Sequence, residues 1–122
     1  MLKQTVAVVG ASTDPTKYGA KAVKAYVRDG WEVYPIHPTA EHLDGLRCYR
    51  RLTEVPERLN RVTLYLPPEK GLAVLDDIVA VRPDEFFVNP GAESDELLAR
   101  AEALALEPIV ACSILAIGQQ PD

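Results

Sequence analysis

The sequence predicts a doubly wound α/β domain around a mainly parallel sheet of five to six strands. Three observations support this fold class. Short apolar runs recur along the chain, helical patterns separate most of them, and Gly, Pro or small polar residues follow the runs. Uninterrupted apolar runs are typical of strands buried on both faces, as in a parallel sheet. Their alternation with helices predicts right-handed crossovers and helices on both faces.

Five apolar runs are predicted as strands, and each is rich in Val, Ile, Leu, Phe or Tyr. In chain order they are Thr5–Gly10, Glu32–Ile36, Val62–Leu66, Glu85–Val88 and Pro108–Cys112.

Three helices are predicted between the strands, over Tyr18–Asp29, Pro68–Val81 and Ser94–Leu106. Gly30 follows the first helix as a glycine C-cap. Pro68 opens the second helix at a position where proline is favoured. Ser94, followed by two acidic residues, is a suitable N-cap for the third helix.

The segment Ala40–Asn60 interrupts this alternation. We expect a short edge strand at Leu46–Tyr49 and a brief helical turn around Thr53–Arg58. Neither an internal repeat nor a linker is present in the sequence, so residues 1–122 are predicted to form one domain.

Composition narrows the class of protein. The chain has 122 residues, of which 48% are hydrophobic and 25% charged, as in globular proteins. Its net charge of −5 argues against nucleic acid as the main partner. The charge is uneven: residues 1–61 hold ten Lys and Arg against seven Asp and Glu, whereas residues 62–122 hold three against eleven. A polyanionic small molecule is therefore better tolerated near the N-terminal half.

Two features give an expectation for the cellular compartment. No apolar stretch reaches the roughly 20 residues that span a bilayer, and Met1–Gln4 leads into the first strand without a secretory segment. The two cysteines, Cys48 and Cys112, are too few for a disulfide framework and lack metal-site spacing. We therefore expect a cytoplasmic protein with reduced thiols and no membrane partner.

The end of the first strand carries the clearest functional signal. Its apolar run ends in Gly10-Ala11-Ser12, and a strand, a small-residue turn and a helix together make an anion site. The full dinucleotide fingerprint is absent, because Ser12 and Pro15 occupy its second and third glycine positions. Ser12 and Lys17 could both contact a phosphate, although ordinary turn and solvated roles fit them about equally well.

The other strand ends should lie on the same rim of the sheet. His37-Pro38 stands where an NAD site usually carries an acid for the ribose, which favours a phosphorylated ribose, although a merely exposed histidine fits about equally well. The remaining ends are Leu66-Pro67-Pro68, Asn89-Pro90-Gly91 and Cys112-Ser113. Glu93 beyond them could accept hydrogen bonds from a ligand or cap the next helix. The sequence has no nucleophile elbow, P-loop or zinc-protease motif, so it offers no evident catalytic apparatus.

Taken together, these residues resemble the small CoA-binding protein family, single-domain relatives of the CoA-binding domain of the succinyl-CoA synthetase α subunit. The resemblance covers nearly the whole chain. It is carried by Val6–Ser12, Gly30–Pro38, Leu43–Gly45, Thr53–Pro56, Tyr65–Glu69, Phe87–Leu97 and Pro108–Ser113.

The resemblance implies a Rossmann-like fold with coenzyme A lying across the switch point of the sheet. By position it places Gly10, Ala11, Ser12 and Thr13 at the phosphates, Lys17 and Tyr18 beside them, His37 and Pro38 near the ribose and adenine, Leu66, Pro67 and Pro68 on the opposite wall, and Asn89 and Gly91 on the same rim. Two departures stand out. The family commonly has Asn at position 37, and many members have an Arg-rich stretch where this chain has Leu66-Pro67-Pro68.

The leading interpretation is therefore a cytoplasmic CoA or acyl-CoA binding protein without chemistry of its own. A small NAD(P)-type oxidoreductase, a thiol-active protein working through Cys112, and a regulatory subunit of an acyl-CoA enzyme are the alternatives. Each of these interpretations is compatible with a homo-oligomer or with a partner acyl-CoA enzyme. A mixed disulfide between Cys112 and the thiol of CoA is a further prediction.

Overall fold

A computed structural model describes residues 3–121 of the chain. A five-stranded sheet lies at its centre in the order β2-β1-β5-β6-β7, with every neighbouring pair parallel. Its strands are β1 (Thr5–Val9), β2 (Glu32–Ile36), β5 (Arg61–Leu64), β6 (Glu85–Val88) and β7 (Pro108–Val110). The predicted α/β class with a parallel sheet is confirmed.

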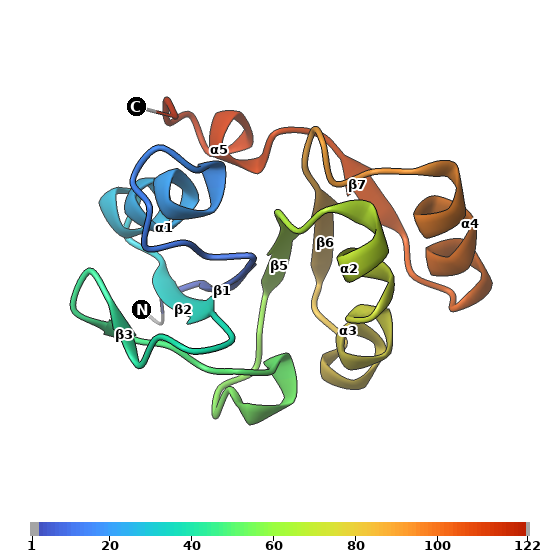
Figure 1. Ribbon diagram of the computed structural model, residues 1–122, viewed down its shortest axis with the longest axis horizontal. Helices are drawn as coiled ribbons and strands as arrows, with labels where there is room; N and C mark the ends of the chain where they lie inside the picture. The colour runs from blue at the N-terminus through green and yellow to red at the C-terminus, as the bar shows by residue number, and fades with distance from the viewer. Residues whose placement is uncertain (1–2, 122) are drawn as a thin grey trace.

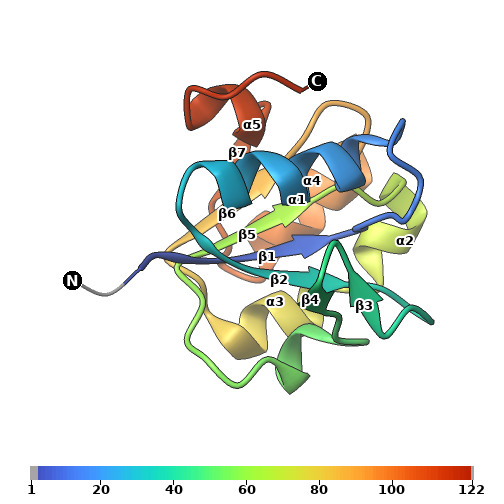
Figure 2. The same cartoon turned by 90° about the vertical axis from the view of Figure 1, so that its left-hand side faces the viewer.

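Helices cover both faces of this sheet (Figure 1). α1 (Tyr18–Arg28) and α5 (Ser113–Ala116) lie on one face (Figure 2). α2 (Pro68–Leu72), α3 (Leu75–Val81) and α4 (Asp95–Ala103) lie on the other, with the 3-10 turn η1 (Leu52–Glu54). Strand side chains alternate between the two resulting cores: Val6 and Val8 face α1, whereas Ala7 and Val9 face α2–α4.

One row of paired residues marks the carboxyl edge of the sheet. Ile36, Val9, Leu64, Val88 and Val110 stand side by side across the five strands. Every segment that follows these residues therefore leaves the sheet at the same rim. The strand order reverses between β1 and β5, and this position is where open α/β sheets bind ligands.

The predicted edge strand at Leu46–Tyr49 is wrong in extent. β3 (His42–Leu43) and β4 (Leu46–Arg47) instead form a two-stranded antiparallel hairpin. Asp44 and Gly45 have φ angles of 50° and 80°, the left-handed pair that a tight hairpin turn requires. Only Tyr49 reaches the main sheet, through a bridge to Ile36. The helical turn expected at Thr53–Arg58 is the shorter η1.

The helix predicted over Pro68–Val81 is broken into α2 and α3 at Ala73–Val74. Gly71 lies in α2 just before this break, and glycine weakens a helix interior by about 1 kcal/mol relative to alanine. A Cβ on Gly71 would lie 2.9 Å from Leu97 Cδ1 and 3.2 Å from Leu64 Cδ2, so an added side chain would require these two leucine side chains to shift. The short α5 was not predicted.

The other predicted helices are confirmed with small shifts at their ends. Gly30 follows α1 with φ +86° and its N–H donates to the carbonyl of Val27 at 3.1 Å. Ser94 caps α4 by accepting the N–H of Leu97 at 3.0 Å. Over the described residues, no helix is both long and apolar enough to cross a membrane.

Candidate functional site

Gly10 occupies the switch point between β1 and β5. Its φ is +94°, and a Cβ there would lie 3.0 Å from both the nitrogen of Leu66 and the carbonyl carbon of Tyr65. Both the backbone conformation and the close approach of the β5 loop therefore require glycine. The first residue of the predicted phosphate turn thus lies against the predicted opposite wall.

A second glycine, Gly19, completes this turn and was missed at the sequence level. A Cβ on Gly19 would lie 2.0 Å from the carbonyl oxygen of Gly10. The first turn of α1 therefore packs directly on the turn that follows β1. Close helix packing is the role of the third fingerprint glycine. Here the glycine in that role is at position 19, beyond the six-residue span of the fingerprint that begins at Gly10.

The N-terminus of α1 is suited to an anion. Its N-cap residue, Lys17, makes no side-chain capping hydrogen bond, and the first turn holds no acidic residue. A lysine at this end opposes the helix dipole, whereas a bound anion would complement both.

The loop between β1 and α1 is ordered by its own side chains. The Ser12 hydroxyl accepts the N–H of Asp14 at 3.0 Å, and Asp14 Oδ1 accepts the N–H and hydroxyl of Thr16 at 2.9 and 2.7 Å. The Ser12 proton remains free to be donated. Hydrogen bonds from Thr16 lower the pKa of Asp14. An ionised carboxylate therefore stands in the predicted phosphate loop and opposes an anion. Thr13 and Tyr18 are exposed beside it.

His37 orders the loop after β2. Its Nδ1 accepts the N–H groups of Thr39 and Ala40 at 3.1 and 2.9 Å. An accepting Nδ1 places the ring proton on Nε2, which is left as a donor. An asparagine oxygen forms the same kind of turn with following N–H groups. The departure from the family's Asn therefore keeps the loop geometry, with Pro38 exposed next to it.

The opposite wall of the predicted site follows β5. Leu66 and Pro68 are half-buried, and Pro67 is the exposed N-cap of α2. All three lie at the carboxyl rim, as expected. They supply apolar surface and no charge.

Asn89 has a structural role that the sequence did not reveal. Its side chain is buried and donates to Thr63 Oγ1 at 2.6 Å and to the carbonyl of Leu64 at 2.9 Å. Its oxygen accepts the N–H of Ser113 at 2.8 Å. Both amide hydrogens of Asn89 therefore bind protein groups, and a ligand contact of this residue stays a prediction. Asn89 ties α5 to the ends of β5 and β6.

Gly91 and Glu93 form one unit on the rim. The Gly91 N–H donates to Glu93 Oε2 at 2.9 Å, and Gly91 has φ +93°. Glu93 therefore stabilises its own loop, and Ser94 caps the helix. The Gly91 N–H is consequently not free for a ligand.

The side of the candidate site next to α5 is formed by Tyr65, Cys112 and Ser113. The Tyr65 hydroxyl lies 3.2 Å from Ser113 Oγ, and burial raises the pKa of Tyr65 to about 12. The phenol is protonated at neutral pH and cannot act there as a base. Cys112 is half-buried at the N-cap of α5 and packs against the core beneath α1.

Cavities flank the Gly10 turn on both sides of the sheet. One of about 170 Å³ lies between the phosphate loop and the β3–β4 hairpin; Ser12, Thr13, Lys24 and His42 are among its lining residues. Another of about 250 Å³ opens beside Val9 and Ile36 on the opposite side. Across residues 3–121, no group of three metal-ligating side chains is present.

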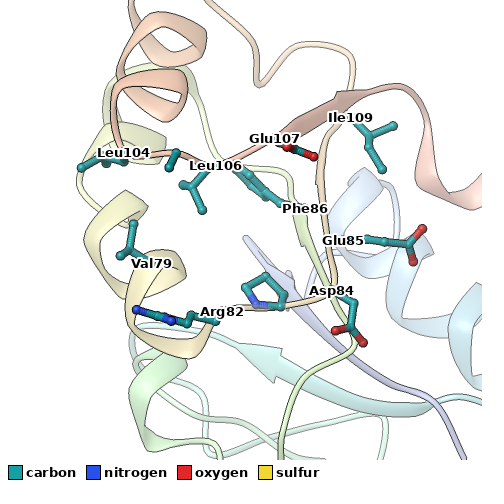
Figure 3. Close-up of a pocket in the computed structure, with 11 residues that line it drawn as sticks. Val79, Arg82, Asp84, Glu85, Phe86, Leu104, Leu106, Glu107 and Ile109 are labelled. Carbon is teal, nitrogen blue, oxygen red and sulfur yellow. The ribbon is translucent and has the colours of Figure 1, made fainter.

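A larger cavity of about 550 Å³ lies at the other end of the sheet, where α3 and α4 end and β6 and β7 begin (Figure 3). Two of its three acidic residues form ion pairs, Asp84 with Arg58 and Glu85 with Arg61, each at 2.7 Å. It lies at the amino ends of the strands, where ligands of such sheets do not normally bind.

Several solved structures have the same fold as this chain and a related sequence. A conserved hypothetical protein from Pyrococcus furiosus superposes with a TM-score of 0.83 at 30% identity, over 94% of this chain and 99% of its own. The dinucleotide-forming acetyl-coenzyme A synthetase 1 of Ca. Korarchaeum cryptofilum superposes with a TM-score of 0.77 at 32% identity. That match covers 88% of this chain and 25% of the synthetase chain.

Sequence relatives include the α subunit of an ADP-forming acetate–CoA ligase II of P. furiosus. It is 34% identical over 65 residues, which are 51% of this chain and 14% of the ligase subunit. This chain thus spans a small part of that relative. The sequence profile described as a CoA binding domain matches residues 4–118. Since that match accounts for nearly the whole chain, this protein belongs to the CoA-binding domain family.

Proposed function

We propose that this protein binds coenzyme A or an acyl-CoA at the switch point of its sheet and performs no chemistry of its own. One observation carries the proposal. Gly10 and Gly19 bring the β1 turn against an uncapped helix N-terminus with Lys17 at its start. Backbone N–H groups and the helix dipole at such a position favour a diphosphate.

The residues present fit this ligand. The Gly10–Ser12 turn and Lys17 would hold the diphosphate, His37 and Pro38 would lie beside the ribose, and the apolar residues after β5 would line the pantetheine path. When bound, CoA supplies only a thiol or thioester. The polar groups nearest the expected path are engaged in the fold, since Asn89 clamps α5 and Tyr65 stays protonated.

A second role is supported by the comparisons. One sequence relative is named as a subunit of an acetate–CoA ligase, and this chain corresponds to a small part of it. We therefore also propose that residues 1–122, as one CoA-binding domain in the cytoplasm, can serve a separate acyl-CoA enzyme as a partner chain.

Calorimetric titration with CoA and with NAD tests the proposal, and CoA is expected to bind more tightly. Ser12 and His37 both depart from the NAD pattern. Gly10→Val should abolish binding, because the added side chain meets Leu66 and Tyr65 backbone atoms. Tighter binding of NAD, or unchanged CoA affinity in a folded Gly10→Val protein, would overturn the proposal. Native mass spectrometry of freshly purified protein would identify any retained acyl-CoA from the increase in the mass of the protein.

A further inference from the structure

Arg50 is held at the carboxyl end of β2, immediately beyond the rim. The His37 N–H donates to the carbonyl of Tyr49, and the Tyr49 N–H to that of Pro35, both at 2.9 Å. These bonds place the next residue, Arg50, beside the loop that follows β2. The Arg50 guanidinium donates through Nη1 to the carbonyl of Pro38.

Within residues 3–121, Arg51 is held in a close ion pair, whereas its neighbour Arg50 is not. Arg51 makes a two-pronged ion pair with Asp77 of α3, at 2.7 and 3.1 Å. Arg50 has no carboxylate within 4.0 Å among the residues that the structure describes. Arg50 is exposed at the end of β2, with Glu41 and Glu54 lining the pocket on its hairpin side, so its guanidinium is open to a ligand and is not held in a close ion pair with any described residue.

Both arginines border the cavity of about 250 Å³ beside Val9 and Ile36. Leu52, Ala73 and Val74 supply further apolar wall, the last two at the break between α2 and α3. A buried cavity of about 150 Å³ accepts benzene. The space is therefore adequate for the larger, bicyclic ring of a purine, with Arg50 at its polar end.

We propose that Arg50 recognises a phosphate on the ribose of the ligand while this apolar cavity holds the adenine. In dinucleotide sites, the end of the second strand holds the ribose, and a nearby arginine accommodates a ribose phosphate. CoA carries such a phosphate at its ribose 3′ position. This inference rests on the proposed function, and it makes Arg50 the residue that distinguishes CoA from 3′-dephospho-CoA.

Calorimetric titrations of the full chain with CoA and with 3′-dephospho-CoA, at one low ionic strength, test this. The wild type should bind CoA at least tenfold more tightly, because charge-assisted hydrogen bonds are strong. In Arg50→Gln that preference should fall to within twofold, with the affinity for 3′-dephospho-CoA unchanged. Arg47→Gln is the matched control: its guanidinium lies over the Tyr49 ring at 5.2 Å, and the preference should survive.

Arg50→Lys separates charge from geometry, since it keeps the cation and loses the guanidinium fork; it should retain part of the preference. Equal binding of both ligands by the wild type would overturn the role of Arg50 while leaving CoA binding intact. So would an Arg50→Gln protein that loses both ligands equally, because Arg50 would then act only through the Pro38 loop. Failure of the wild type to bind either ligand would refute the proposed function and this inference together.

Discussion

Replacing Gly19 by alanine adds a single methyl group, and we expect it to lower both the stability of the fold and the affinity for CoA. The new Cβ would lie 2.0 Å from the carbonyl oxygen of Gly10, 2.9 Å from its carbon and 3.3 Å from the Cα of Ala11. All three neighbours are backbone atoms, so no side-chain rotation relieves the clash. Ordinary contact begins at 3.4 Å, so helix and turn must separate by about 1.4 Å.

Two effects of opposite sign set the magnitude. Overpacking typically costs about 1–3 kcal/mol, and a Cβ placed 2.0 Å from a backbone oxygen puts this substitution at the upper end of that range, near 3 kcal/mol. Alanine returns about 1 kcal/mol through its higher helix propensity, because Gly19 lies in α1. We expect a net loss near 2 kcal/mol in the free energy of unfolding. Because the displaced turn is the predicted phosphate site, CoA affinity should also fall at least tenfold.

Urea unfolding followed by the fluorescence of Trp31 measures this directly. Trp31 is the one tryptophan, and its ring packs edge-on against Tyr26 at 5.1 Å. With a denaturant slope of about 1–3 kcal/mol per molar, the midpoint should fall by about 1 M.

Two other glycines serve as controls. Gly71→Ala meets flexible ends of Leu97 and Leu64 and should cost less. Gly30→Ala meets open space and suffers only the strain of its positive φ, about 1 kcal/mol. A Gly19→Ala protein as stable as the wild type, or more stable, would show that helix propensity outweighs the packing and would refute the reasoning.

Three further predictions concern the site, and a fourth concerns the ion pair of Asp84 at the opposite end of the sheet. His37→Ala should lower the free energy of unfolding by about 1 kcal/mol, because the Thr39 and Ala40 N–H groups lose their acceptor, whereas His37→Asn should stay near the wild type; equal losses in urea unfolding would contradict this. Asp14→Asn keeps an oxygen for Thr16 but removes a charge from the phosphate loop, so calorimetry should show CoA binding a few times more tightly, and weaker binding would argue against a phosphate there. Hydrogen bonds from Arg58, then Asn60, lower the pKa of Asp84 to about 2, so its contribution to stability is complete above pH ~4 and is lost as pH falls toward 2; Asp84→Asn should flatten thermal stability over that window, and an unchanged acid profile would exclude it as a cause. Oxidised CoA should leave an adduct on the wild type by intact mass, as the Cys112 thiolate displaces one CoA thiol from the disulfide, and an adduct that persists in Cys112→Ser would assign it to Cys48 instead.

The parallel sheet could be predicted because its strands are continuous apolar runs, and their ends locate the rim. Gly10 was found for the same reason. Gly19 was not, since its requirement is a contact with a carbonyl nine positions earlier, which only the packing of α1 on the turn creates.

Long-range hydrogen bonds explain why the roles of Asn89 and Arg50 could not be predicted from the sequence. Asn89 looked like a free rim residue, but Thr63 and Ser113, 26 and 24 positions away, take its side chain. Arg50 follows a segment that pairs with the main sheet only through Tyr49, so its position beside Pro38 depends on one bridge to Ile36. No local pattern contains these contacts.

The location of CoA on the protein is the central claim, and amide chemical-shift mapping during a CoA titration tests it most directly. The shifts that change most should belong to Gly10–Tyr18 and to the loop after β2, around His37–Ala40. Changes concentrated instead on Arg82–Phe86 and Leu104–Ile109, around the cavity at the amino ends of β6 and β7, would contradict the account (Figure 3).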